Sequence, residues 1–216
     1  MKQAIVRWTQ RIFIGFIALV AITVVGITFI ILAEKYWMAQ FNRTHERPLQ
    51  VDPSQLVLES AHRLLSKLQP EQSGNRLQFV VMPSFGKRWF AVSIAEVNGQ
   101  GVGEAIVEAR DTEHLERRAF IMSRAELLTL LERWDALTDG YSGEGHALTD
   151  GSPLAFERRR GERVTSGEGN SPCHYGVLGD WAAQRLSQYV PELQDLRYFG
   201  DKPWKSDDCN RSIFSL

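Results

Sequence analysis

The uncharged apolar segment 12–33 constrains this chain more than any other feature of its sequence. Fifteen of its 22 residues are Ile, Leu, Val or Phe, and the others are Gly, Ala and Thr. A helix of this length is about 33 Å long, which is enough to cross a hydrocarbon core of about 30 Å. The segment therefore predicts a transmembrane helix.

The residues on either side of this segment favour a permanent membrane helix over a cleaved signal peptide. No small-residue cleavage site follows Ala33, because the next five residues are Glu-Lys-Tyr-Trp-Met. Trp8 on one side, and Tyr36 and Trp37 on the other, are typical of the aromatic belts at the two membrane interfaces. We therefore expect a single-pass protein whose first partner is the lipid bilayer.

The basic residues before the segment predict its orientation. Lys2, Arg7 and Arg11 lie within eleven residues that contain no acidic side chain, whereas the other flank mixes basic and acidic residues. The positive-inside rule then predicts a cytoplasmic N-terminal segment at 1–11 and an extracytoplasmic C-terminal domain. The expected location is a bacterial-type inner (plasma) membrane.

The interior of the apolar segment contains no ionisable residue and no histidine, which disfavours an ion pathway or a bound cofactor. Gly15, Ala18 and Ala21 form a line of small residues at i, i+3 spacing. Such a line can accept a neighbouring helix, although small residues that simply face lipid are the simpler interpretation.

Size and charge limit the function of the remaining residues. The chain has 216 residues, which leaves enough beyond the membrane segment for one ordinary domain. Its formal net charge is −1 even with the basic N-terminus included, so the rest of the chain is mildly acidic. A nucleic-acid partner is not expected, because such proteins present a basic surface to phosphate.

The soluble part predicts one α+β domain at 52–199, after a polar juxtamembrane linker at 34–51 and before an irregular tail at 200–216. Helical spacing of apolar residues predicts helices at 52–69, 123–137 and 177–190. Alternation and β-branched or aromatic content predict strands at 77–82, 89–97, 105–109, 117–122, 154–160 and 163–166. We expect an antiparallel sheet of four to six strands whose apolar face packs against the helices at 123–137 and 177–190.

Two cysteines, Cys173 and Cys209, both lie in the soluble part. In an oxidising compartment an intrachain disulfide between them is plausible. In the loop-entropy model, closing a loop of this size contributes roughly 3 to 4 kcal/mol. Two unrelated buried thiols are the alternative.

Glycines and the Cys-His pair resemble catalytic or nucleotide-binding motifs only in part. A dinucleotide-binding fingerprint needs a third glycine three positions after the second, and Gly99, Gly101 and Gly103 do not have this spacing. A glycine-rich hairpin turn at 98–103 explains these glycines better. Cys173 and His174 are adjacent, but neighbours in an extended chain point apart, so His174 is a poor base for that thiol. No catalytic residue is therefore assigned.

Charged residues give no clear metal site. The five histidines have no paired ligand spacing, and no metal or other cofactor is expected. Asp139, Glu144 and Asp150 share a glycine-rich loop without the ligand spacing of a calcium loop. The basic run 157–163 fits a charge-guarded edge strand better than a phosphate site.

These observations favour a non-catalytic function. The expected protein is an accessory or assembly subunit of a membrane protein complex, with an extracytoplasmic interaction domain and a membrane protein partner. A membrane-tethered periplasmic enzyme with a scattered active site is the alternative, because active sites are often assembled from residues far apart in sequence.

Overall fold

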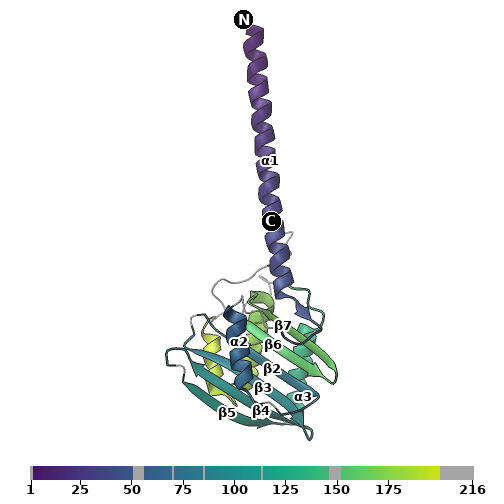
Figure 1. Cartoon of the computed structure of the whole chain (residues 1–216), viewed down its shortest axis with the longest axis vertical. Helices are drawn as coiled ribbons and strands as arrows, with labels where there is room; N and C mark the ends of the chain where they lie inside the picture. Colours follow the sequence, from purple (N-terminus) through teal and green to yellow (C-terminus); the bar gives the residue numbers. More distant parts are fainter. Residues whose placement is uncertain are drawn as a thin grey trace.

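The computed structural model describes residues 2–50, 56–69, 71–84, 86–112, 114–145 and 152–199. One long helix, α1 (Lys2–Asn42), leads into a domain of strands and helices. Figure 1 shows this helix standing out from the domain, with only its last turns beside the strands. The predicted α+β fold with a single long N-terminal helix is confirmed.

Helix α1 is long and apolar enough to cross a membrane between Phe13 and Asn42. Its apolar side chains between Phe13 and Leu32 are all exposed to the surroundings rather than packed on the domain. The hydroxyls of Thr23 and Thr28 donate hydrogen bonds to the carbonyls of Leu19 and Val24, each at 2.9 Å. Both polar groups are thereby satisfied within the helix, as a hydrocarbon environment requires.

The sheet has seven strands, all paired antiparallel, in the order β1-β7-β6-β2-β3-β4-β5. This is slightly more than the four to six strands expected. The additional strand is the two-residue β1 beside the end of α1. The strands are β1 (Thr44–His45), β2 (Asn75–Val81), β3 (Arg88–Val97), β4 (Gln100–Ala109), β5 (Leu115–Met122), β6 (Leu154–Arg160) and β7 (Arg163–Gly169).

Helices cover both faces of the sheet. On one face lie α3 (Arg124–Thr138), α4 (Val177–Leu186) and the 3₁₀ helix η2 (Pro191–Phe199). On the other face lies α2 (Leu56–Lys67), which crosses the strands in the front of Figure 1. The first set matches the helices expected at 123–137 and 177–190, whereas the sequence left the packing partner of α2 open.

Strand periodicity explains how one sheet serves two cores. In β2, Leu77, Phe79 and Val81 point toward α3 and α4, while Val80 points toward α2. Successive side chains of a strand point to opposite faces, so a strand covered on both sides is apolar at nearly every position. The α3 side holds the larger core, centred on Trp134 and the aromatic rings around it.

The glycine-rich turn is shorter than expected. Only Asn98 (φ 51°) and Gly99 (φ 78°) form the turn between β3 and β4, and both have positive φ as a tight hairpin requires. Gly101 and Gly103 lie within β4, where a Cβ atom would collide with the side chains of Met122 and Phe120. Because a strand follows these glycines, they do not form a nucleotide-binding loop.

Two boundaries differ from the sequence-based expectation. Residues 34–42 continue α1 instead of forming a polar linker, since the end of this helix packs on the domain. Helix α4 ends at Leu186, and Pro191 then begins η2, where its fixed φ suits the first helical position. The first residues of the helix expected at 52–69 lie outside the described residues, and α2 is described from Leu56 onward.

Candidate functional site at the helix–domain junction

The end of α1 is built into the domain rather than attached to it by a flexible link. Asn42, the last residue of α1, is completely buried. Its amide nitrogen donates to the carbonyl of Glu144 (3.2 Å), and its amide oxygen accepts from the backbone N–H of Asn170 (3.3 Å). A single side chain therefore connects α1 to two separate loops of the domain.

The loop 141–145 lies directly against the last turns of α1. A Cβ atom at Gly143 would collide with the carbonyl of Ala39, and one at Gly145 would lie 3.1 Å from Lys35. Gly143 also has a positive φ of 86°. Only glycine allows this close approach in this backbone conformation. The loop thus fits α1 closely over about two helical turns.

Strand β1 fastens the chain immediately after the helix. The backbone N–H of Thr44 donates to the carbonyl of Tyr141 (3.0 Å), and its hydroxyl donates to the carbonyl of Thr138 (2.7 Å). Thr44 also pairs with Gly167 of β7. We call these contacts of residues 39–45 with 138–145 and 167–170 the junction.

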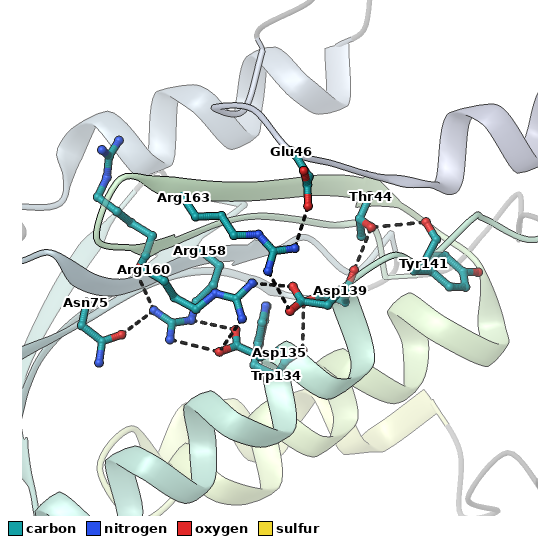
Figure 2. A network of polar contacts seen from close by, with 12 residues as sticks. Thr44, Glu46, Asn75, Trp134, Asp135, Asp139, Tyr141, Arg158, Arg160 and Arg163 are labelled. Carbon is teal, nitrogen blue, oxygen red and sulfur yellow. Dashed lines mark hydrogen bonds and ion pairs between the residues drawn. The ribbon is translucent and has the colours of Figure 1, made fainter.

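An ion-pair network extends from the junction along the α3 side of the sheet, as Figure 2 shows. Glu46 accepts from Arg163 at 2.6 Å, and Arg163 lies 3.5 Å from Asp139. Asp139 in turn accepts from Arg160 at 2.7 Å. Arg160 lies 3.4 Å from Asp135, so the charges form one chain from Glu46, just after β1, to helix α3.

Arg158 is the buried centre of this network, with only 3% of its surface exposed. Its guanidinium donates two bonds to the carboxylate of Asp135 (2.9 and 3.2 Å) and one to the amide oxygen of Asn75 (2.7 Å). Burial lowers the pKa of Arg158, and the bonds to Asp135 oppose this shift. A buried cation is tolerated only with such complete pairing.

Beside the junction, a stack of rings surrounds the π-helix η1 (Pro172–Gly176). The ring of His174 stacks on Tyr141, with centroids 3.5 Å apart and planes within 10°, and meets Tyr175 edge-on at 4.9 Å. Burial lowers the pKa of His174 to about 4 and raises the pKa of both tyrosines. All three rings are therefore uncharged near neutral pH.

The residues expected at the membrane interfaces are exposed. Trp8, Tyr36 and Trp37 all project from α1, and the rings of Tyr36 and Trp37 meet edge-on at 6.0 Å. Trp8 and Trp37 are separated by about 43 Å of helix, close to the bilayer thickness with headgroups included. The spacing of these aromatic residues is consistent with two interfacial belts.

The small residues proposed for helix packing touch nothing in the described part of this chain. A Cβ atom at Gly15 would meet no atom within 4 Å, and Ala18 and Ala21 are exposed. Both the helix-packing and the lipid-facing interpretation thus stay open.

The structure does not test the disulfide. Cys209 lies outside the described residues, and only the backbone of Cys173, within η1, is described. The disulfide therefore stays a prediction.

No metal-binding cluster of three or more His, Cys, Asp or Glu side chains occurs among the described residues. Of the three acidic loop residues considered for calcium, Asp139 pairs with Arg160 and Arg163. Glu144 lies in the junction loop, and Asp150 lies outside the described residues.

The interpretation of the basic run 157–163 as a guarded edge strand is wrong for residues 157–160, because β6 lies between β7 and β2. Its arginines are paired with carboxylates of α3 and of the sheet itself, which leaves little positive charge for a phosphate. One signal in the sequence pointed to the burial of Arg158. Arg158 follows Leu154 and Phe156 at every second position, and in a strand such residues point to the same face of the sheet.

Asn42, Thr44 and Asp135 were not identified from the sequence. Each is a polar residue in a segment of ordinary polar composition, and its role depends on partners far along the chain.

Comparison with protein-family models, with curated proteins and with solved structures gives no match for this chain. The site must therefore be interpreted from its own geometry. That geometry is a joint: paired charges, a buried amide and stacked neutral rings fix a membrane-length helix to a sheet.

Proposed function

We propose that this chain is a single-pass membrane-anchored protein whose domain is a non-catalytic interaction module, an accessory or assembly subunit of a membrane protein complex. The observation that carries this proposal is the burial of Asn42, which joins α1 to the domain without a linker. A rigid joint fixes the height and the direction in which the domain faces from the membrane.

The arrangement of the sheet supports this role. Strand β1 lies beside the end of α1, and the sheet then extends strand by strand to β5 on the far side. From Ala33 to Asn42 the helix rises by only about 14 Å, so the domain stands close to the membrane surface. A partner in the same membrane would meet the domain in one defined orientation.

The enzymatic alternative receives less support from the same site. It would depend on Cys173 and His174, and the imidazole of His174 is buried against Tyr141 with only 7% of the residue exposed. A pKa of about 4 makes this ring a weak base near neutral pH. The stacked arrangement suits a packing role better than proton transfer.

The proposed location is a bacterial-type inner membrane with residues 1–11 in the cytoplasm and the domain outside. Protease added to spheroplasts should then digest the domain while the membrane remains intact. If only detergent-permeabilised membranes allow digestion, the orientation is reversed.

In that oxidising location we also propose a disulfide between Cys173 and Cys209. Labelling of the unfolded, unreduced chain with a thiol reagent should then modify neither cysteine, and labelling after reduction should modify both. Modification of both without reduction excludes the disulfide.

Isolation of the full chain in mild detergent tests the interaction function. We expect it to elute with a second membrane protein at a fixed stoichiometry, and cross-linking in intact membranes should give the same pair. A chain that behaves as a free monomer in both experiments would contradict the proposal.

Insertions after Ala33 test the rigid joint. One added alanine rotates the domain by about 100° around the helix, whereas seven return it to within about 20° of its original direction and raise it by about 10 Å. If the direction of the domain matters, the single insertion should disrupt the complex more than the longer one. A flexible tether would tolerate both insertions equally.

A further inference from the structure

The apolar segment of α1 ends abruptly, and this end marks where hydrocarbon would give way to lipid headgroups. Ala33 is its last residue, and Glu34 and Lys35 are the first charged residues after it. Charged side chains are costly within hydrocarbon, whereas aromatic residues such as Trp37 are enriched at the headgroup level. The headgroup layer is about 5–8 Å thick on each side of a bilayer. Along α1 it therefore covers about residues 34–38.

The loop 141–145 packs against α1 at this same level. A Cβ atom at Gly145 would lie 3.1 Å from Lys35, which is only about 3 Å along the helix from Ala33. A Cβ atom at Gly143 would collide with the carbonyl of Ala39, about 9 Å from Ala33. A tilt of α1 by about 20° changes the depth of a group about 8 Å from the helix axis by only about 3 Å. The loop thus reaches the headgroup layer whichever way the helix leans.

The composition of this loop suits a hydrated, charged layer. Its irregular backbone would not be tolerated in hydrocarbon, but water and headgroups can satisfy it. Ser142 is exposed and offers a hydroxyl. The charges at this level, Glu34, Lys35 and Glu144, are of both signs, as are those of zwitterionic headgroups. The loop therefore has the chemistry of a surface that lies among lipid headgroups.

We propose that the loop 141–145 contacts the phospholipid headgroups of the membrane that α1 crosses. The domain is then positioned by the bilayer at this loop as well as by the buried end of α1. The other side of α1 stays open to lipid, since Trp37 is 69% and Phe41 37% exposed. This inference depends on the proposed membrane anchor, and it assigns a lipid partner to one loop while the rest of the domain remains available to a protein.

Photolabelling in proteoliposomes tests the contact. The full chain is placed in phosphatidylcholine vesicles that contain a phospholipid with a diazirine on its headgroup, and labelled peptides are identified by mass spectrometry. The loop 141–145 and the α1 peptide with Trp37 should both be labelled. The exposed turn at Asn98 should be labelled at least tenfold less, because it lies near Arg124, at the opposite end of α3 from the loop. Figure 1 shows the strands and α3 beyond the end of α1, away from its membrane segment.

An insertion variant tests whether α1 sets the depth of the loop. Seven glutamines between Glu34 and Lys35 keep Glu34 at the membrane boundary, raise the domain by about 10 Å and return it to within about 20° of its direction. Labelling of the loop should then fall at least tenfold. The peptide that contains Glu34 is the control within the same variant, and its labelling should not change.

The outcomes separate this contact from the membrane anchor. If Trp37 is labelled without the loop, or if the insertion variant labels the loop as strongly as the wild-type chain, the headgroup contact is overturned and the anchored interaction module stands. If neither α1 nor the loop is labelled, the anchor and the headgroup contact are overturned together.

Discussion

On one face of the sheet, α3, α4 and η2 together bury a continuous core, whereas on the other face α2, together with Leu49, covers a smaller one. The larger core includes the rings of Phe79, Trp134 and Phe156, while the smaller one consists mainly of Leu, Ala and Val side chains. Apolar area removed from water sets much of the stability of each layer. The two faces should therefore contribute unequally to folding.

Each face also holds one buried charge, and the two charges are connected differently. Arg158 bonds to α3 and to the sheet, and its network reaches Glu46, the residue after β1, through Asp139 and Arg163. Glu108, 3% exposed, accepts from Arg63 and Lys67, both on α2. The α3 face is thus tied to the segment that follows α1, whereas the polar bonds of Glu108 tie α2 to β4. We expect α2 to open locally while the α3 face and the junction stay folded.

Truncation of Trp134 should give the largest loss of stability. Its ring lies 5.1 Å from that of Phe79 and 5.5 Å from that of Phe156, fully buried between sheet and helix. Trp134→Ala should lower the free energy of unfolding by about 3–5 kcal/mol through lost burial and the cavity left behind. Chemical denaturation in detergent measures this change.

Trp134→Phe is the control for this substitution. The indole N–H of Trp134 has no hydrogen-bond partner among the described residues, so phenylalanine removes an unsatisfied group together with part of the ring. Its cost should be at least about 2 kcal/mol smaller than that of alanine. Equal losses for the two variants would show that the polar atom contributes to stability.

Leu64→Ala on the other face should cost less, about 2–3 kcal/mol, and the effect should be local. Leu64 is fully buried between α2 and the sheet. The amides of α2 should lose protection in native-state hydrogen exchange before those of α3 do. Glu59→Ala, at an exposed position of the same helix, should change neither measurement. If α2 and α3 lose protection together, the two faces form one cooperative unit.

Local patterns in the sequence predicted the core of this fold but not its joint. The strand expected at 77–82 and the helix expected at 123–137 depend on patterns among neighbours within a few residues, and the structure has both elements. Asn42 depends on Asn170, 128 positions away, so no local pattern marks it as buried. The position of β6 between β7 and β2 likewise follows from long-range pairing.

Acid should weaken the junction side of the molecule before it weakens the α2 face. Burial lowers the pKa of His174 to about 4 from an ordinary value of 6.5. As the pH falls below about 6.5, the unfolded chain therefore binds a proton at this imidazole that the folded chain does not bind. The free energy of unfolding then decreases until the pH reaches about 4. The loss at pH 5.5 should be about 1 kcal/mol relative to pH 8.

His174→Phe provides the control for this acid effect. It keeps a ring against Tyr141 and removes the titrating group, so the loss between pH 8 and pH 5.5 should largely disappear. Tyr141 and Tyr175, which face the ring, do not titrate in this range because burial raises the pKa of both. An unchanged pH dependence in this variant would assign the acid effect to other groups.

The smallest effect should come from Arg63, which donates two bonds of 2.6 Å to Glu108 but is itself 43% exposed at its side chain. Arg63→Met should cost about 0.5–1 kcal/mol at neutral pH, because solvent screens the pair and Lys67 remains.

The bonds from Arg63 lower the pKa of Glu108, while burial opposes this shift. This contribution is therefore present above about pH 4.5 and is lost as the pH falls through the lowered pKa of the folded state. In Arg63→Met that pKa rises, so the acid loss on the α2 face should begin at a higher pH, as denaturation between pH 3 and pH 6 would show. Lys67→Met should move the onset less, since Lys67 makes one bond of 3.2 Å. A larger shift from Lys67→Met would mean that Lys67, rather than Arg63, holds α2 to β4.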